Sequence, residues 1–307
     1  WGIIMKNFLL SLVVMFSSYG IGHYFGGTWL AGLPTGLLGF MIAYFLSARS
    51  SMRKLEVITQ EAMTLVQEGQ SSQKPEMMLS SLDAGLTVFE KGLDLSKEQF
   101  LMAEVVHAQM GALLYQGASL VLQLKMQAEM ERSRVEVTRQ ETKAKQYFTQ
   151  ARFHLEKAHS KDWVKTLIRN WQGIGMLAAM EFSEGKKTEA IARLAKCKSI
   201  AKEDPLFWGS YTWMLHQNNQ KSDAMLAANE GLGHNSHHKG LQKMADAIAN
   251  QKEIEPIHFG MMWYSVFPEQ LTVNIAMKLQ SQAPDDGSAP AMNRQQRRAM
   301  KKKGYNA

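Results

Sequence analysis

Residues 8–25 read FLLSLVVMFSSYGIGHYF and residues 28–46 read TWLAGLPTGLLGFMIAYFL, and neither stretch contains Asp, Glu, Lys or Arg. The stretches are 18 and 19 residues long, close to the ~20 residues with which a helix crosses ~30 Å of hydrocarbon. Gly26 and Gly27 lie between them, where a tight turn is needed. The pattern predicts a transmembrane helical hairpin within residues 1–54, contacting the lipid bilayer through residues 8–46.

The basic residues around this hairpin predict its orientation. Lys6 precedes the first stretch, Arg49, Arg53 and Lys54 follow the second, and the turn contains no Lys or Arg. Basic flanks prefer the cytoplasmic side of a membrane. We therefore expect both ends of the hairpin, and the rest of the chain, on the cytoplasmic side.

Two other interpretations of the first residues stay open. The run from Met5 resembles a signal peptide, and cleavage near Gly20 would leave one spanning helix. The absence of an A-x-A site and the apolar continuation to Phe25 argue against cleavage. The other alternative is a soluble protein that buries the apolar hairpin in its interior.

The composition shows that the positive charge is local. The formal net charge is +7, but residues 287–307 contain six basic residues and no acidic one, which leaves about +1 for the remainder. A near-neutral body argues against a nucleic-acid-binding fold. A single cysteine, Cys197, excludes an internal disulfide and suits a reducing compartment.

The body, residues 55–256, is expected to be all-α because apolar residues recur at intervals of three and four and strong helix formers dominate. Two segments repeat one spacing: Trp171-x2-Ile174-Gly175-x2-Ala178 with Ala190-x3-Leu194-x2-Cys197, and Trp208-x2-Tyr211-Thr212-x2-Leu215 with Ala224-x3-Ala228-x2-Gly231. A third copy is His107-x2-Met110-Gly111-x2-Leu114 with Ala151-x3-Leu155-x2-Ala158, interrupted by a long insertion.

This spacing resembles that of the tetratricopeptide repeat family over roughly residues 79–240, and the whole layout resembles the membrane-anchored bacterial type of that family. The resemblance implies an α-solenoid that binds a partner protein, here at the cytoplasmic face of the bacterial inner membrane. The family's Tyr in the first helix is absent from each unit, so a looser solenoid of helical hairpins stays open.

The function expected from this resemblance is that of a scaffold or adaptor for protein–protein interaction. Its candidate partner-binding residues on the first helices are Asn170, Gln172 and Asn218. The alternative is a structural subunit of a large membrane complex of the secretion, pilus or motor type. No motif for an enzyme, a cofactor or a metal site was found, so none is predicted.

Three further segments depart from the repeat. Residues 120–150 lack Gly and Pro and are densely charged, which predicts a helix protruding from the stack. Residues 257–280 are apolar and aromatic, and we expect either a helix capping the last repeat or an exposed partner-binding patch with Trp263, Tyr264 and Phe267.

Residues 281–307 are predicted to be a flexible linker followed by a disordered basic tail. The tail has the composition to contact anionic lipid or RNA, or to serve only as a solubilising end. Its basic residues are Arg294, Arg297, Arg298, Lys301, Lys302 and Lys303.

Overall fold

The computed structural model describes residues 6–26, 29–72, 74–98, 102–160, 171–272 and 275. Every regular element within these ranges is helical, which confirms the all-α prediction. The predicted linker and basic tail at 281–307 lie outside the described residues.

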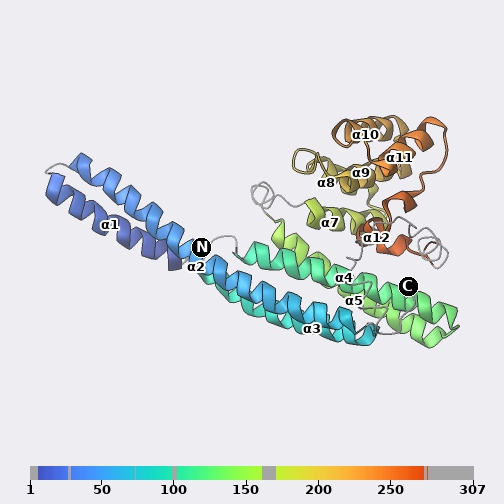
Figure 1. Cartoon of the computed structure of the whole chain (residues 1–307), viewed down its shortest axis with the longest axis horizontal. Helices are drawn as coiled ribbons and strands as arrows, with labels where there is room; N and C mark the ends of the chain where they lie inside the picture. Colours follow the sequence, from blue (N-terminus) through green and yellow to red (C-terminus); the bar gives the residue numbers. More distant parts are fainter. Residues whose placement is uncertain are drawn as a thin grey trace, which may run out of the picture.

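The first two helices form a hairpin at one end of the molecule (Figure 1). α1 (Lys6–Gly26) lies beside the first half of α2 (Trp29–Ser71), which continues without a break into the body. At 1.5 Å per residue, the 43 residues of α2 extend over roughly 65 Å. One helix therefore belongs both to the hairpin and to the body.

The hairpin exposes large apolar side chains and packs small residues between its helices. Phe16 and Phe45 are each 66% exposed, and Phe25 is 82% exposed. A Cβ atom added to Gly32 would lie 2.8 Å from the ring of Tyr19, and one added to Gly36 would lie 3.1 Å from the carbonyl oxygen of Met15. Small residues at a helix interface with apolar residues outside are typical of helices packed in lipid.

Within the described ranges, α1 and α4 (Met102–Met130) are the helices long and apolar enough to cross a membrane. The buried share of the apolar window is 6% in α1 and 50% in α4. Because α4 contributes Val106, Leu113 and Tyr115 to the core, we interpret it as a core helix. The second predicted span is the first half of α2.

The second half of α2, residues 49–71, packs with three more helices into one layer of the body. These are α3 (Pro75–Gly92), α4 and α5 (Arg134–Ala158), and the short turn η1 (Leu93–Lys97) follows α3. α4 and α5 approach closely at Gly111, where an added Cβ would lie 2.6 Å from Cγ of Leu155. The third copy of the repeat spacing is therefore a helix pair with a close crossing point.

The predicted single helix at 120–150 is wrong. α4 ends at Met130 and α5 begins at Arg134, so the insertion is the outer part of an antiparallel helical hairpin. Arg132 makes the reversal with a positive φ of 57°. The tip of this hairpin forms the end of the molecule opposite α1 (Figure 1).

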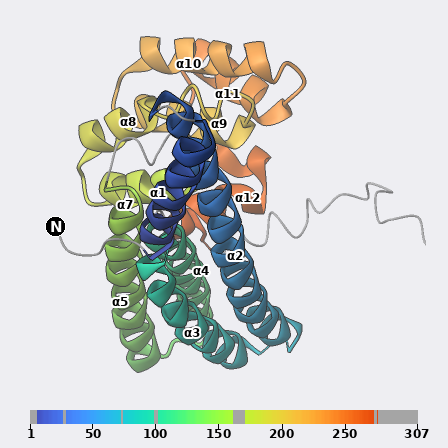
Figure 2. The same ribbon diagram turned by 90° about the vertical axis from the view of Figure 1, so that its left-hand side faces the viewer.

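The remaining helices form a second layer on one side of the first, as both views show (Figure 2). α7 (Trp171–Ser183) pairs with α8 (Lys187–Ala195), and α9 (Pro205–Gln217) pairs with α10 (Lys221–His234) and contacts α11 (Lys239–Ala249). The repeat positions predicted in this region are all buried: Trp171, Ile174, Gly175, Ala178, Ala190, Leu194, Cys197, Trp208, Tyr211, Thr212, Leu215, Ala224, Ala228 and Gly231.

Asp204 explains why α9 begins where it does. Its side chain accepts hydrogen bonds from the backbone N–H groups of Leu206 and Phe207, which caps the helix. Its second oxygen accepts a 2.7 Å hydrogen bond from the indole N–H of Trp171. The same carboxylate therefore starts one helix pair and ties it to the preceding pair.

The segment after α11 is a series of short helical elements rather than one helix, and we call residues 256–272 the C-terminal turns. η2 (Pro256–Phe259), α12 (Met261–Val266) and η3 (Pro268–Gln270) cover the aromatic side of α9, and Trp263 lies 5.8 Å from Trp213 between ring centroids. Trp263, Tyr264 and Phe267 are at most 5% exposed. Of the two alternatives expected for this segment, the exposed patch is wrong, because these three residues cover the core.

A candidate partner-binding groove

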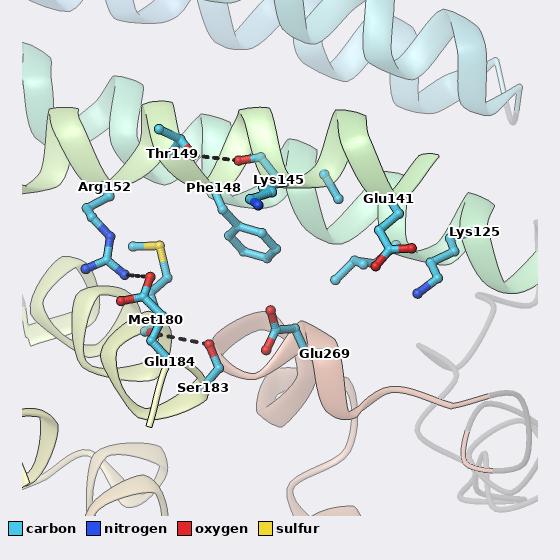
Figure 3. Close-up of a pocket in the computed structure, with 12 residues that line it drawn as sticks. Lys125, Glu141, Lys145, Phe148, Thr149, Arg152, Met180, Ser183, Glu184 and Glu269 are labelled. Atoms are coloured by element: carbon cyan, nitrogen blue, oxygen red, sulfur yellow. Dashed lines mark hydrogen bonds and ion pairs between the residues drawn. The ribbon is translucent and has the colours of Figure 1, made fainter. Parts of the chain in front are cut away.

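An open groove runs between the α4–α5 hairpin on one side and the end of α7 with the C-terminal turns on the other. Three adjoining cavities of about 480, 270 and 370 Å³ form it, and Glu269 lines all three. We call this the α5 groove, and Figure 3 shows its largest cavity. Its walls come from four separate segments of the chain: α4, α5, the end of α7 and the C-terminal turns.

The floor of the α5 groove is apolar. Leu122 of α4, Phe148 of α5 and Met180 of α7 line its largest cavity. The inner cavity adds the aromatic rings of Tyr115, Trp213 and Phe267. The groove therefore offers apolar and aromatic contacts below its rim, as peptide-binding grooves do.

The rim of the α5 groove is charged on both sides. Glu141, Lys145 and Arg152 recur along one face of α5, and Glu184 and Glu269 lie opposite them (Figure 3). An ion pair between Arg152 and Glu184 closes one end. In the ranges given above, no ion pair involves Glu141, Lys145 or Glu269, so these charges are available to an occupant.

Tyr115 ties the two walls of the groove together. Its hydroxyl group donates a 2.6 Å hydrogen bond to the carbonyl oxygen of Val266 in the C-terminal turns. Burial, reinforced by the negative charge of Glu269, raises the pKa of Tyr115. The hydroxyl therefore stays protonated and remains a donor at physiological pH.

A histidine pair lies elsewhere between α4 and α5. The Nδ1 atoms of His107 and His154 are 2.9 Å apart. Burial is the main cause that lowers the pKa of both rings, that of His154 to about 4. The charge of Lys157 further lowers the pKa of His107, and a proton on His107 would disfavour a second proton on His154. The pair is therefore neutral at pH 7, with one ring donating to the other.

The residues predicted for partner binding do not come together at the groove. Asn170 lies outside the described residues, and Gln172 is exposed at the start of α7, away from the groove lining. Asn218 ends α9, where its side chain donates to Gln220. Of the predicted aromatic residues, Phe267 lines the inner cavity. The six predicted basic-tail residues fall outside the described ranges.

The sequence contains one local signal for the groove. Glu141, Lys145, Phe148 and Arg152 recur at intervals of three and four, which places them on one face of a helix. The opposite wall, at residues 183–184 and 268–272, has no such signal. Among the described residues, no group of three or more His, Cys, Asp or Glu residues is arranged to hold a metal ion.

Comparison with known proteins finds no family model, no curated protein and no solved structure that matches this chain.

Proposed function

We propose that this chain is a membrane-anchored scaffold of the tetratricopeptide-repeat type that holds a partner protein at the cytoplasmic face of the bacterial inner membrane. The observation that carries the proposal is the hairpin of α1 and α2. Its outer surface is apolar and exposed, with side chains such as Phe16 and Phe45 66% exposed. Exposing apolar side chains to water costs about 25 cal/mol of free energy for each Å². Lipid removes this cost by covering the surface.

The continuity of α2 supports a scaffold role. The helix leaves the hairpin and enters the core of the body, where Leu55, Ala62 and Val66 are buried. A partner held by the body is therefore held at a defined distance from the membrane. The paired helices α7–α8 and α9–α10, the latter with Gly231 directly against Trp208, support the repeat type.

The α5 groove is the surface that best fits a partner segment. Its apolar floor suits the apolar face of a helix or an extended peptide, and its rim charges suit a segment with both acidic and basic residues. Lys145 favours an acidic residue, and Glu269 favours a basic one.

The test is affinity purification of the full-length protein from detergent-solubilised membranes, washed at low and at high salt, with mass spectrometry of the retained proteins. We expect substoichiometric partners that are lost at high salt, because charged contacts at a rim are screened. A stoichiometric set of membrane proteins that survives high salt would contradict the adaptor role and support a fixed subunit of a membrane complex.

Two groove variants and one matched control sharpen this test. Lys145→Glu and Glu269→Lys each reverse a rim charge, so each is expected to reduce the recovered partner. Lys143→Glu makes the same charge change on the same helix, but Lys143 lines a shallow hollow with Val135 and Arg139 instead of the groove. Equal loss in all three variants would contradict the groove as the binding surface.

A further inference from the structure

Basic residues gather where the apolar surface of the hairpin ends. We call this region the hairpin base: residues 6–7 of α1 and 47–54 of α2. Lys6, Arg49 and Arg53 are exposed there, directly beyond Phe8 and Leu46, where the runs of exposed apolar residues on the two helices end. Further along α2, Met52 and Val57 are exposed singly. The turn end of the hairpin, residues 25–30, contains no Lys or Arg.

The spacing of the two arginines matches the thickness of a headgroup layer. Arg49 and Arg53 are four residues apart, so they lie on one face of α2, one turn and ~6 Å apart along its axis. The polar layer on each side of the hydrocarbon is roughly 5–8 Å thick. Along the helix axis, Arg49 lies about 4.5 Å and Arg53 about 10.5 Å beyond Leu46. Both guanidinium groups can reach this layer, because the long side chain of Arg53 can extend back toward the hydrocarbon.

Lys54 differs from the two arginines because a carboxylate neutralises it. Its Nζ atom lies 2.6 Å from Oε2 of Glu98, and this contact is the main reason that the pKa of Glu98 is lowered. Among the ion pairs of the described residues, none includes Lys6, Arg49 or Arg53. The net charge of the hairpin base is therefore positive, and its arginines are free of protein carboxylates within that part of the chain.

Polar contacts hold the hairpin base in one arrangement. The Asn7 side chain donates a 2.9 Å hydrogen bond to the hydroxyl of Ser51, and the Asn7 backbone N–H donates a 3.2 Å hydrogen bond to the carbonyl oxygen of Glu98. Three chain segments are thus joined at the level of the arginines. The arginines project from a fixed support, which reduces the entropy lost when they bind a ligand.

We infer that Arg49 and Arg53, assisted by Lys6, form a binding site for the headgroup of an anionic phospholipid. The guanidinium group presents a planar fork of donors that matches phosphate oxygens, and two such groups one turn apart can hold one phosphate. An anionic lipid is favoured over a zwitterionic one because the one carboxylate at the hairpin base, that of Glu98, is paired with Lys54, and no ion pair of the described residues neutralises the two arginines. The inference rests on the proposed function, in which residues 8–46 lie in the bilayer.

The test is native mass spectrometry of the full-length protein released from micelles that contain equal amounts of phosphatidylglycerol and phosphatidylcholine. The unmodified protein is expected to retain phosphatidylglycerol preferentially. The Arg49→Gln/Arg53→Gln variant is expected to bind it roughly 25-fold more weakly, about fivefold for each arginine removed. The Arg49→Lys/Arg53→Lys variant keeps the charge and is expected to keep most of the preference.

A matched control is Arg134→Gln/Arg139→Gln, which removes the same charge from exposed positions on α5. Retention of phosphatidylglycerol is expected to be unchanged in this control. Absence of a lipid preference in the unmodified protein, equal loss in the control, or equal loss in the lysine variant would each overturn the inference. A full-length protein that stays in solution without detergent would instead overturn the proposed membrane hairpin.

Discussion

Trp208 shows how one pair of residues sets the approach of two helices. Its side chain is fully buried, and its indole N–H donates a 2.8 Å hydrogen bond to the carbonyl oxygen of Lys202. A Cβ atom on Gly231 would lie 2.6 Å from the Cβ of Trp208. Because that atom is the root of a fixed side chain, it cannot move aside, and α9 and α10 cross this closely only with Gly at position 231.

We predict that Gly231→Ala destabilises the protein by about 1–2 kcal/mol, because overpacking outweighs the gain of about 1 kcal/mol in helix propensity. Gly233→Ala is the matched control in the same helix, since a Cβ there has no neighbour within 4 Å. The control is expected to leave the thermal unfolding midpoint unchanged or raise it. Equal midpoints for the two variants, measured by tryptophan fluorescence in detergent, would show that the close approach has no energetic effect.

The His107–His154 pair predicts a pH dependence of stability. The pKa of His154 is lowered to about 4 in the folded protein, whereas an unfolded histidine titrates near ~6.5. Between these values the unfolded chain binds a proton that the folded chain does not, so the free energy of unfolding falls as the pH decreases from ~6.5 to ~4. His107 and His238, whose pKa values are also lowered by burial, add to the same trend.

The measurement is the thermal unfolding midpoint of the full-length protein at several pH values between 4 and 7. We expect His154→Asn to flatten the decrease, because Asn retains hydrogen-bonding groups but has no charge to acquire. An equally steep decrease in this variant would assign the pH dependence to other groups.

At the scale of elements, the turn between α4 and α5 is the least predictable connection. Residues 129–137 read EMERSRVEV, with no Gly or Pro to mark a turn. The chain nevertheless reverses because Ala144, Tyr147, Ala151 and Leu155 of α5 are buried against α4. Packing between the helices therefore overrides local helix propensity, and Arg132 adopts a left-handed conformation.

We predict that Arg132→Gly stabilises the protein by about 0.5–1 kcal/mol, because Gly adopts a positive φ without steric cost. Arg134→Gly, two residues later at the start of α5, is expected to destabilise it, because that position is helical. The comparison is made from the unfolding midpoints of the two variants. A lower midpoint for Arg132→Gly would contradict the left-handed conformation of residue 132.

The repeat spacing explains why much of the fold could be predicted. Trp171, Trp208 and the small residues Ala224 and Ala228 encode contacts between helices adjacent in sequence, and such contacts leave a local pattern. The α5 groove joins residues near 145, 183 and 269, so no local pattern contains it. Trp263 and Phe267 fit two alternatives from sequence, because composition alone does not distinguish aromatic residues that cover a core from those exposed for a partner.

At the scale of the whole molecule, the proposal divides the chain into a part in lipid and a part in water, joined by α2. The α1–α2 hairpin, the second half of α2 and the tip of the α4–α5 hairpin follow one another along the long axis of the molecule (Figure 1). This order predicts that the turn of the hairpin and the body lie on opposite sides of the membrane.

The most direct test of this arrangement is cysteine labelling with a membrane-impermeant maleimide in spheroplasts, in protein whose single, buried Cys197 is replaced by Ala. Gly26→Cys at the hairpin turn is expected to react in intact spheroplasts. Ser265→Cys, at an exposed position of the body, is expected to react only after lysis. Labelling of both cysteines, or of Ser265→Cys alone, in intact spheroplasts would contradict a hairpin that spans the membrane with its body in the cytoplasm.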